Sequence, residues 1–282
     1  MDSVSPEIGA KIEKVGALIR GLNGAMVALS AGVDSSLVAL LAYKALGENA
    51  IAVTGVSESL PREELNIAKQ TADAIGIRHL TVRTSELENP DYSSNPADRC
   101  YVCKQTLYSE LRTLADSYHF QSILDGTHVD DLGDDRPGLK AASEAGVISP
   151  LLQASFSKSE IRDAARFLGL AVWDKPAMPC LSSRIAHGDR ITIEKLGMVG
   201  QAESYIKDLT GVRNLRVRYR DSSARIEVAP GERTEFFDEK IMDEIDRELR
   251  RLGFADVALD LRGYARRNKS PGRDELVLPM AV

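Results

Sequence analysis

The stretch Met26-Val-Ala-Leu-Ser30-Ala-Gly-Val-Asp34-Ser-Ser36 decides how this chain folds. Its first four residues are apolar and predict a buried parallel strand. The small residues that follow let the backbone turn tightly into an apolar helix that opens at Ser35 and Ser36. Such a turn places free N–H groups and the positive helix end at one point, beside the serine hydroxyls. The stretch therefore predicts an anion site, and a phosphate chain suits it.

A carboxylate inside this loop sharpens the prediction. Magnesium is held by one or two carboxylates together with phosphate oxygens, so Asp34 predicts a bridging Mg²⁺. The loop lacks the Gly-Lys-Ser/Thr of a Walker A motif. It resembles the Ser-Gly-Gly-x-Asp-Ser loop of the N-type ATP pyrophosphatases, with Ala31 in place of the first glycine. Those enzymes adenylate a carboxylate or carbonyl and release pyrophosphate. An ordinary strand–turn–helix with a serine-rich cap is the alternative.

Composition narrows the class of protein. The 282 residues carry a net charge of −6, which argues against general nucleic-acid binding. No apolar run approaches the roughly 20 residues of a membrane span. The first residues lack the pattern of a signal peptide, so a cytoplasmic location is expected. In a reducing compartment the three cysteines are interpreted first as metal or redox ligands.

Strands and helices alternate along the first two thirds of the chain, which predicts an α/β fold. Apolar strands are expected at 26–29, 50–56, 79–83 and 122–128. The prediction is a doubly wound, mostly parallel sheet with helices on both faces and its ligand at the carboxyl ends of the strands. Gly126 and Thr127 would be delivered to that edge.

A change of pattern predicts a second domain. The segment 177–184 reads as the seam, so the domains are expected at 1–184 and 185–282. The second would be a smaller α+β domain for substrate binding or oligomerisation. Its expected elements are helices at 193–208 and 232–252 and strands at 215–220, 224–228 and 255–261.

The cysteines form a pair and a distant third. Cys100 and Cys103 have Cys-x-x-Cys spacing, and with Cys180 they make three thiolates that leave one coordination position open, as in a reactive centre. A redox disulfide, a zinc site completed by His or Asp, and inert buried thiols are the alternatives. Ser182, Ser183 and Arg184 follow Cys180. They would hold its thiol as a nucleophilic thiolate, or merely cap the next element.

Arginines alternate along one predicted strand. Arg216 and Arg218 share a face, and Arg220 extends the row. Such guanidinium groups suit a bidentate phosphate or carboxylate site. A solvated face balanced by acids on 224–228 has nearly equal weight. A turn-rich loop carries four acids that would either bind magnesium or solvate the loop: Asp130, Asp131, Asp134 and Asp135.

Taken together, these motifs resemble the LarE family, the ATP-dependent sulfur insertases of nickel-pincer nucleotide biosynthesis. The resemblance covers nearly the whole chain. Besides the phosphate loop, it rests on Arg99-Cys-Tyr-Val-Cys-Lys104, Asp125-Gly-Thr-His-Val-Asp-Asp-Leu-Gly-Asp134 with Arg136-Pro-Gly138, Cys180-Leu-Ser-Ser-Arg184, Leu215-Arg-Val-Arg218 and Asp260-Leu-Arg-Gly-Tyr264. Ala31 and His128, where Asn is common, are small departures.

The resemblance implies a fold, a substrate and a reaction. The fold is that of the adenine nucleotide alpha hydrolase-like PP-loop domain. The substrate is pyridinium-3,5-biscarboxylic acid mononucleotide, whose carboxylates are adenylated in turn and converted to thiocarboxylates. Members with a lone cysteine at position 180 sacrifice its sulfur. Members with three cysteines carry a 4Fe-4S cluster, and Cys100, Cys103 and Cys180 place this chain with them.

Residue roles are implied in the same way. The family pattern puts ATP and Mg²⁺ on Ser30, Gly32, Asp34, Ser35 and Ser36, with Gly126 and Thr127 beside the nucleotide. It puts the substrate phosphate on Ser183, Arg184, Arg216 and Arg218, and makes Cys180, Asp34 and Ser30 catalytic. Family members are often hexamers, and their partners are the carboxylation and nickel-insertion enzymes of the pathway.

Rival interpretations remain open. The chain would alternatively use Cys180 as a sacrificial donor, or be another adenylating enzyme such as a tRNA thiolase, an NAD synthetase or a GMP synthetase-like enzyme. A tRNA thiolase would be expected to show a basic surface, unlike this acidic chain. A non-catalytic cluster- or nucleotide-sensing module is the third alternative, and it would not need Asp34.

Overall fold

The computed structural model describes residues 4–132 and 137–264. Asp134, Asp135 and Arg136, singled out above, lie outside the described residues. The chain divides into two compact units, 1–200 and 201–282. The division falls within helix α9 (Ile193–Thr210), whereas the sequence suggested a boundary at residue 184. The separate roles expected for 1–184 and 185–282 stay predictions.

The first unit contains a four-stranded sheet in the order β3-β2-β1-β4. All three pairings are parallel, with Ala25 of β1 opposite Ala50 of β2 and Ser122 of β4. The strands are β1 (Ala25–Ala28), β2 (Ala50–Val56), β3 (Arg78–Arg83) and β4 (Ser122–Leu124). The predicted parallel α/β sheet is confirmed. Its fourth strand is shorter than expected.

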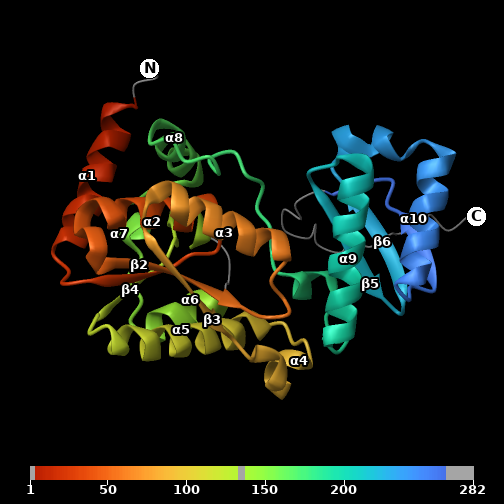
Figure 1. Cartoon of the computed structure of the whole chain (residues 1–282), viewed down its shortest axis with the longest axis horizontal. Helices are drawn as coiled ribbons and strands as arrows, with labels where there is room; N and C mark the ends of the chain where they lie inside the picture. Colours follow the sequence, from red (N-terminus) through yellow and green to blue (C-terminus); the bar gives the residue numbers. More distant parts are fainter. Residues whose placement is uncertain (1–3, 133–136, 265–282) are drawn as a thin grey trace, which may run out of the picture. The chain divides into compact units, whose positions relative to one another are not determined.

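Helices cover both faces of this sheet (Figure 1). The helices of this unit are α1 (Pro6–Arg20), α2 (Val33–Leu46), α3 (Arg62–Ile75), α4 (Pro90–Ser93), α5 (Arg99–Ser117), α6 (Pro137–Glu144), α7 (Pro150–Gln153) and α8 (Lys158–Phe167), of which the short α4 packs against α5 and not against the sheet. Side chains of β1 alternate between the faces, as a pleated strand requires. Ala25 and Val27 pack in the cluster that contains α1, α2, α3, α7 and α8, whereas Met26 packs with α5.

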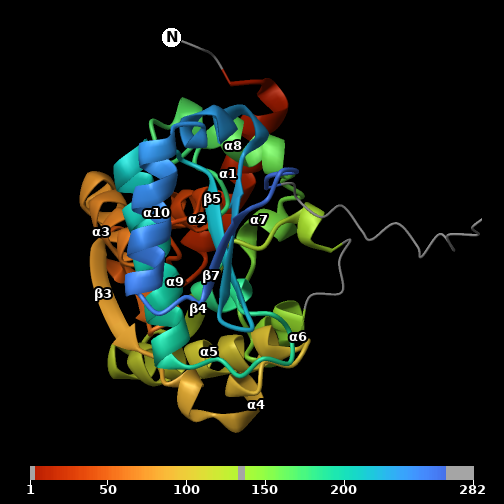
Figure 2. The same cartoon turned by 90° about the vertical axis from the view of Figure 1, so that its right-hand side faces the viewer.

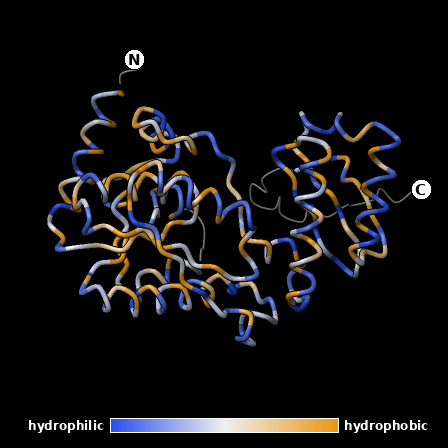
Figure 3. The backbone as a smooth tube through the Cα atoms, viewed as in Figure 1, coloured by the Kyte–Doolittle hydropathy of each residue, from blue (hydrophilic) through white to orange (hydrophobic). Residues whose placement is uncertain are grey.

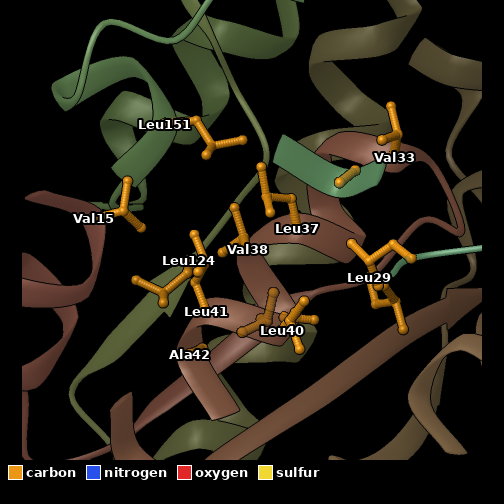
Figure 4. Packing of buried hydrophobic residues seen from close by; sticks show 14 of the residues in the cluster. Val15, Leu29, Val33, Leu37, Val38, Leu40, Leu41, Ala42, Leu124 and Leu151 are labelled. Atoms are coloured by element: carbon orange, nitrogen blue, oxygen red, sulfur yellow. The ribbon is translucent and has the colours of Figure 1, made fainter. Parts of the chain in front are cut away.

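Helix α2, which follows the phosphate loop, is buried along most of its length. Its side chains pack together with Val15 of α1, Leu124 of β4 and Leu151 of α7 (Figure 4). Burial of each such leucine or valine contributes about 1.5–3 kcal/mol. The loop at the start of α2 is therefore attached to a helix that is buried along most of its length. Helix α8 begins with a capping box, in which Ser157 and Glu160 accept each other's backbone N–H groups.

The second unit has a three-stranded sheet in the order β5-β6-β7. Strands β5 (Leu215–Arg220) and β6 (Ser223–Val228) are antiparallel, and β7 (Asp256–Leu259) lies parallel to β6. Helices α9 and α10 (Glu239–Arg251) run alongside this sheet (Figure 2). The predicted start of the second helix is wrong. Residues Pro230–Phe236 form a 3-10 stretch, and Asp238 caps α10 by accepting from the N–H of Lys240.

Apolar residues concentrate on the strands and alternate with hydrophilic residues along the helices within each unit, and hydrophilic residues predominate in many of the loops (Figure 3). Within 4–132 and 137–264, no helix has the length and apolar character needed to cross a membrane.

Candidate active site

A cavity of about 580 Å³ lies at the carboxyl ends of the strands of the first unit. Its wall takes residues from the ends of β1 and β2, from the loop after β4, from α5 and from the segment around Cys180. This is the edge where the alternation of strands and helices predicts a ligand. Eight of the candidate site residues line it together: Ser30, Asp34, Ser35, Gly126, Thr127, Cys100, Cys103 and Cys180.

The phosphate loop is held by its own hydroxyl groups. Gly32 is the N-cap of α2, and its carbonyl oxygen accepts from Ser36 Oγ at 2.8 Å and from Ser35 Oγ at 3.2 Å. Ser35 Oγ in turn accepts from the N–H of Ser30 at 3.1 Å. Ser36 is fully buried and does not line the cavity. In this structure Gly32 and Ser36 therefore shape the turn, and Ser30 and Ser35 face the cavity.

Two small residues let the loop take this shape. Ala31 has φ +59°, a left-handed conformation that favours glycine and strains a residue with a Cβ. The replacement of the family's first glycine is thus tolerated, although the backbone still has the conformation that suits glycine. Gly126 lies directly against the start of α2, because a Cβ there would come within 2.7 Å of the Ser35 nitrogen. Position 126 therefore requires glycine.

Asp34 has a partner that sequence reasoning missed. Lys158 Nζ lies 2.6 Å from each of its carboxylate oxygens. His128 is buried with Nε2 at 3.8 Å from Asp34 Oδ1 and 3.6 Å from Asp131 Oδ2. Lys158 lies on α8, 124 positions from Asp34 in the chain, and no local sequence pattern links the two residues. The loop carboxylate thus faces a cation, as a magnesium ligand would.

Asp125 fixes the loop that follows β4. One of its oxygens accepts from the Thr127 N–H at 3.1 Å and from Ser149 Oγ at 2.7 Å, and the other accepts from Thr127 Oγ1 at 2.8 Å. Tyr108 also donates to this carboxylate at 3.3 Å. Burial raises the pKa of the Tyr108 hydroxyl, and the adjacent Asp125 charge raises it further. Four donors hold Asp125, which places Gly126 and Thr127 on the cavity wall.

The three cysteines meet at the same cavity, although Cys180 comes from a segment far from the other two in the chain. Cys100 is exposed, and Cys103 and Cys180 are partly buried. Burial raises the pKa of the Cys103 thiol to about 12, with Glu86 and Cys180 as further causes. The pKa of Cys180 is also raised by burial, and the nearby Cys100 adds to this effect.

In this arrangement burial raises the pKa of the Cys180 thiol, which opposes a thiolate, so the thiolate expected from the sequence stays a prediction. Arg99 and Arg184 favour the charged form, but burial outweighs them. Arg184 is itself buried, and its guanidinium donates to the carbonyl oxygens of Pro179 at 2.7 Å and Cys180 at 3.2 Å and to Ser183 Oγ at 2.9 Å. These bonds hold the Cys180 segment in place, as does the 2.6 Å hydrogen bond between the Tyr92 and Ser182 hydroxyls.

The cysteine donor set suits a soft metal or an iron–sulfur cluster, which three thiols from two segments bind with one position open. The fit to this structure is partial. The thiols line one cavity, yet in 4–132 and 137–264 no three His, Cys, Asp or Glu side chains form a group that could hold a metal ion. The thiols would therefore have to draw closer around a metal or cluster.

The arginine row lies in the second unit. Arg216 is buried and stacks over the ring of Tyr264 at 4.9 Å, and Arg218 Nε donates to Glu227 at 2.9 Å. Arg225 also pairs with Glu227, at 2.5 Å. Around Arg218 the structure therefore has the alternative arrangement, in which acids on 224–228 balance the charge of the arginines. Roles for Ser183, Arg184, Arg216 and Arg218 on a substrate phosphate stay predictions.

Comparison with known proteins gives similarities to several classes. The NAD synthase family matches residues 8–119. An uncharacterized protein of Synechocystis is 46% identical over 90% of this chain and 95% of its own length. The pyridinium-3,5-bisthiocarboxylic acid mononucleotide synthase of Lactiplantibacillus plantarum is 36% identical over 88% of this chain and 89% of its own length. A glutamine-hydrolyzing GMP synthase component of Archaeoglobus fulgidus is 28% identical, over 65% of this chain and 64% of its own length.

Proposed function

Because the chain belongs to the family of the pyridinium-3,5-bisthiocarboxylic acid mononucleotide synthases, we propose that it is an ATP-dependent sulfur insertase. It adenylates the carboxylates of pyridinium-3,5-biscarboxylic acid mononucleotide and converts them to thiocarboxylates. The observation that carries this proposal is the shared cavity, in which a phosphate loop and three thiols face the same space. An amidating NAD synthetase or GMP synthetase-like enzyme would have no evident use for three thiols there.

Adenylation is needed because a carboxylate has no good leaving group. Its transfer to AMP makes the leaving group a phosphate monoester. Departure of pyrophosphate requires neutralisation of charge, which the start of α2, Ser30 and Ser35 would supply through hydrogen-bond donors. Asp34 would hold Mg²⁺ on the phosphates, and Lys158 adds a second positive charge at the same place.

This step has a direct test. Purified protein with Mg²⁺, ATP and the mononucleotide should produce AMP and pyrophosphate, and omission of the mononucleotide should suppress both. Formation of ADP, or pyrophosphate release that ignores the mononucleotide, would contradict the proposed reaction.

The sulfur would come from a 4Fe-4S cluster held by Cys100, Cys103 and Cys180. When bound, such a cluster supplies a sulfide on its open iron site. The chain's contribution is to hold the cluster by its three thiols within the cavity that the ATP loop also lines. The alternative is that Cys180 alone gives up its sulfur and the Cys-x-x-Cys pair is incidental.

Cys100→Ala separates the two sulfur chemistries. We expect this variant to lose most of its iron and its visible absorption after anaerobic purification. Its ATP cleavage to pyrophosphate should stay within about twofold of the wild-type rate, because substitutions at residues without shared partners act independently. The measurements are iron content, absorption spectrum and pyrophosphate release. Full sulfur transfer by this variant, or loss of the mass of hydrogen sulfide from Cys180 after turnover, would support the sacrificial chemistry instead.

Further parts of the proposal concern substrate and setting. Ser183, Arg184, Arg216 and Arg218 would hold the substrate phosphate, since guanidinium groups bind phosphate in a bidentate manner. The protein would act in the cytoplasm as a homo-oligomer, with hexamers as in other family members. It would receive its substrate from a carboxylating enzyme and pass its product to a nickel-inserting one.

A further inference from the structure

Glu86 is a buried carboxylate on the cavity wall that neither the phosphate loop nor the thiols explain. It lies in the 3-10 turn Glu86–Glu88 after β3 and is only 2% exposed. It lines the cavity together with Cys103 and Cys180, and its charge helps to raise the pKa of the Cys103 thiol. The side chain is thus close to the expected sulfur site.

Its two oxygens differ in their surroundings. Oε1 accepts hydrogen bonds from Ser57 Oγ at 2.6 Å and from Ser59 Oγ at 3.1 Å, which fixes the orientation of the carboxylate. Oε2 is buried and has no hydrogen-bond partner in the part of the chain that the structure describes. A buried carboxylate oxygen without a partner is costly, so this atom calls for a positive or hydrogen-bonding group from a ligand.

The other carboxylates of the cavity are already engaged. Asp34 contacts Lys158, Asp125 accepts from four donors, and Asp131 accepts from the His128 N–H at 3.1 Å. Lys104, a cation on the wall, lies over the ring of Tyr108 at 5.5 Å. Among the described residues of the cavity, Glu86 is therefore the carboxylate that has a buried oxygen, Oε2, without a hydrogen-bond partner.

The proposed substrate carries a matching charge. A pyridinium nitrogen bonded to ribose is permanently positive, and it has no N–H with which to satisfy a hydrogen-bond acceptor. Inside a cavity, the charge of such a cation is balanced by a negative group or by the face of an aromatic ring. The ring must also lie near the thiols and the ATP loop, because its carboxylates react at both.

We propose that Glu86 is the counter-ion of the cationic pyridinium ring and so selects a charged ring over a neutral one. This inference rests on the proposed function and deepens it by assigning a residue to the ring. Ser57 and Ser59 act as positioning residues, since they hold the carboxylate toward the cavity.

The test uses two ligands that differ in the charge of the ring. Nicotinate mononucleotide has a cationic pyridinium ring, and its 1,4-dihydro form has a neutral ring with the same phosphate, ribose and carboxylate. Calorimetry should show that the intact wild-type protein binds the cation at least about tenfold more tightly than the neutral ligand. Glu86→Gln should remove this preference by weakening the cation alone. Glu88→Gln, which changes an exposed acid in the same turn, is the matched control.

Each outcome decides the matter. Equal binding of the two ligands by wild type overturns the inference without any variant, so the test holds even if Glu86→Gln fails to fold. A folded Glu86→Gln protein that still prefers the cationic ligand also overturns it. If that protein keeps the preference and loses its iron, Glu86 is assigned to the metal instead. Failure of thiocarboxylate formation by a wild type that prefers the cation would count against the proposed function and leave the inference standing.

Discussion

Replacement of Asp34 by alanine is expected to lower pyrophosphate release by at least about a hundredfold, the scale on which loss of one charge-stabilising group slows a reaction. The carboxylate would anchor Mg²⁺ on the departing pyrophosphate, and Lys158 is its observed cation partner at 2.6 Å. Without it, the metal loses its protein ligand in the loop. ATP itself should still bind, because the helix end, Ser30 and Ser35 remain.

The measurement is pyrophosphate release at saturating ATP, with ATP affinity determined separately. Asp163→Asn, which neutralises an exposed acid on α8, the helix that carries Lys158, is the control and should match wild type. An unchanged thermal unfolding midpoint would show that Asp34→Ala is folded. Normal pyrophosphate release by that variant would remove Asp34 from the reaction.

Replacement of Cys180 by alanine has the second large expected effect, and it falls on the other half of the reaction. Sulfur incorporation should drop below detection, because this thiol is required by the cluster and by the sacrificial chemistry alike. Pyrophosphate release should remain, since the phosphate loop lies on a different segment of the cavity wall.

The Asp34 and Cys180 variants therefore form a complementary pair. The first keeps its thiols and fails to adenylate, and the second adenylates and fails to transfer sulfur. Product analysis by mass spectrometry, together with a pyrophosphate assay, distinguishes them. A Cys180→Ala protein that still makes thiocarboxylate would place the sulfur donor elsewhere.

The phosphate loop and its sheet were accessible to sequence reasoning because their signals are local. Apolar strands that alternate with helices predict parallel pairing, and the turn from Ser30 to Ser36 marks the edge where the ligand lies. The start of α10 was predicted too early. Its N-cap is Asp238, so the helix begins later than the expected range of 232–252. The conformation of Ala31 has no such signal, because alanine rarely adopts a positive φ.

The missing parts of the site depend on contacts between distant segments. Lys158 meets Asp34 across 124 positions of the chain, and Glu86 meets Ser57 across 29. No periodicity or spacing predicts such pairs. The direction of the Cys180 pKa shift was not predictable from the sequence for a related reason. The hydroxyl and guanidinium neighbours were visible in the sequence, but the burial that outweighs them in setting its pKa belongs to the folded chain.

The central claim is that ATP cleavage and sulfur insertion occur in the same cavity of this chain, and one measurement tests it most directly. The protein is incubated anaerobically with Mg²⁺, ATP, sulfide and pyridinium-3,5-biscarboxylic acid mononucleotide, and the nucleotide product is analysed by mass spectrometry. The account predicts the mass increase of an oxygen-to-sulfur exchange, first at one carboxylate and then at both, with AMP and pyrophosphate formed at each exchange. A mononucleotide of unchanged mass after ATP has been consumed, or one that carries an amide, would contradict it.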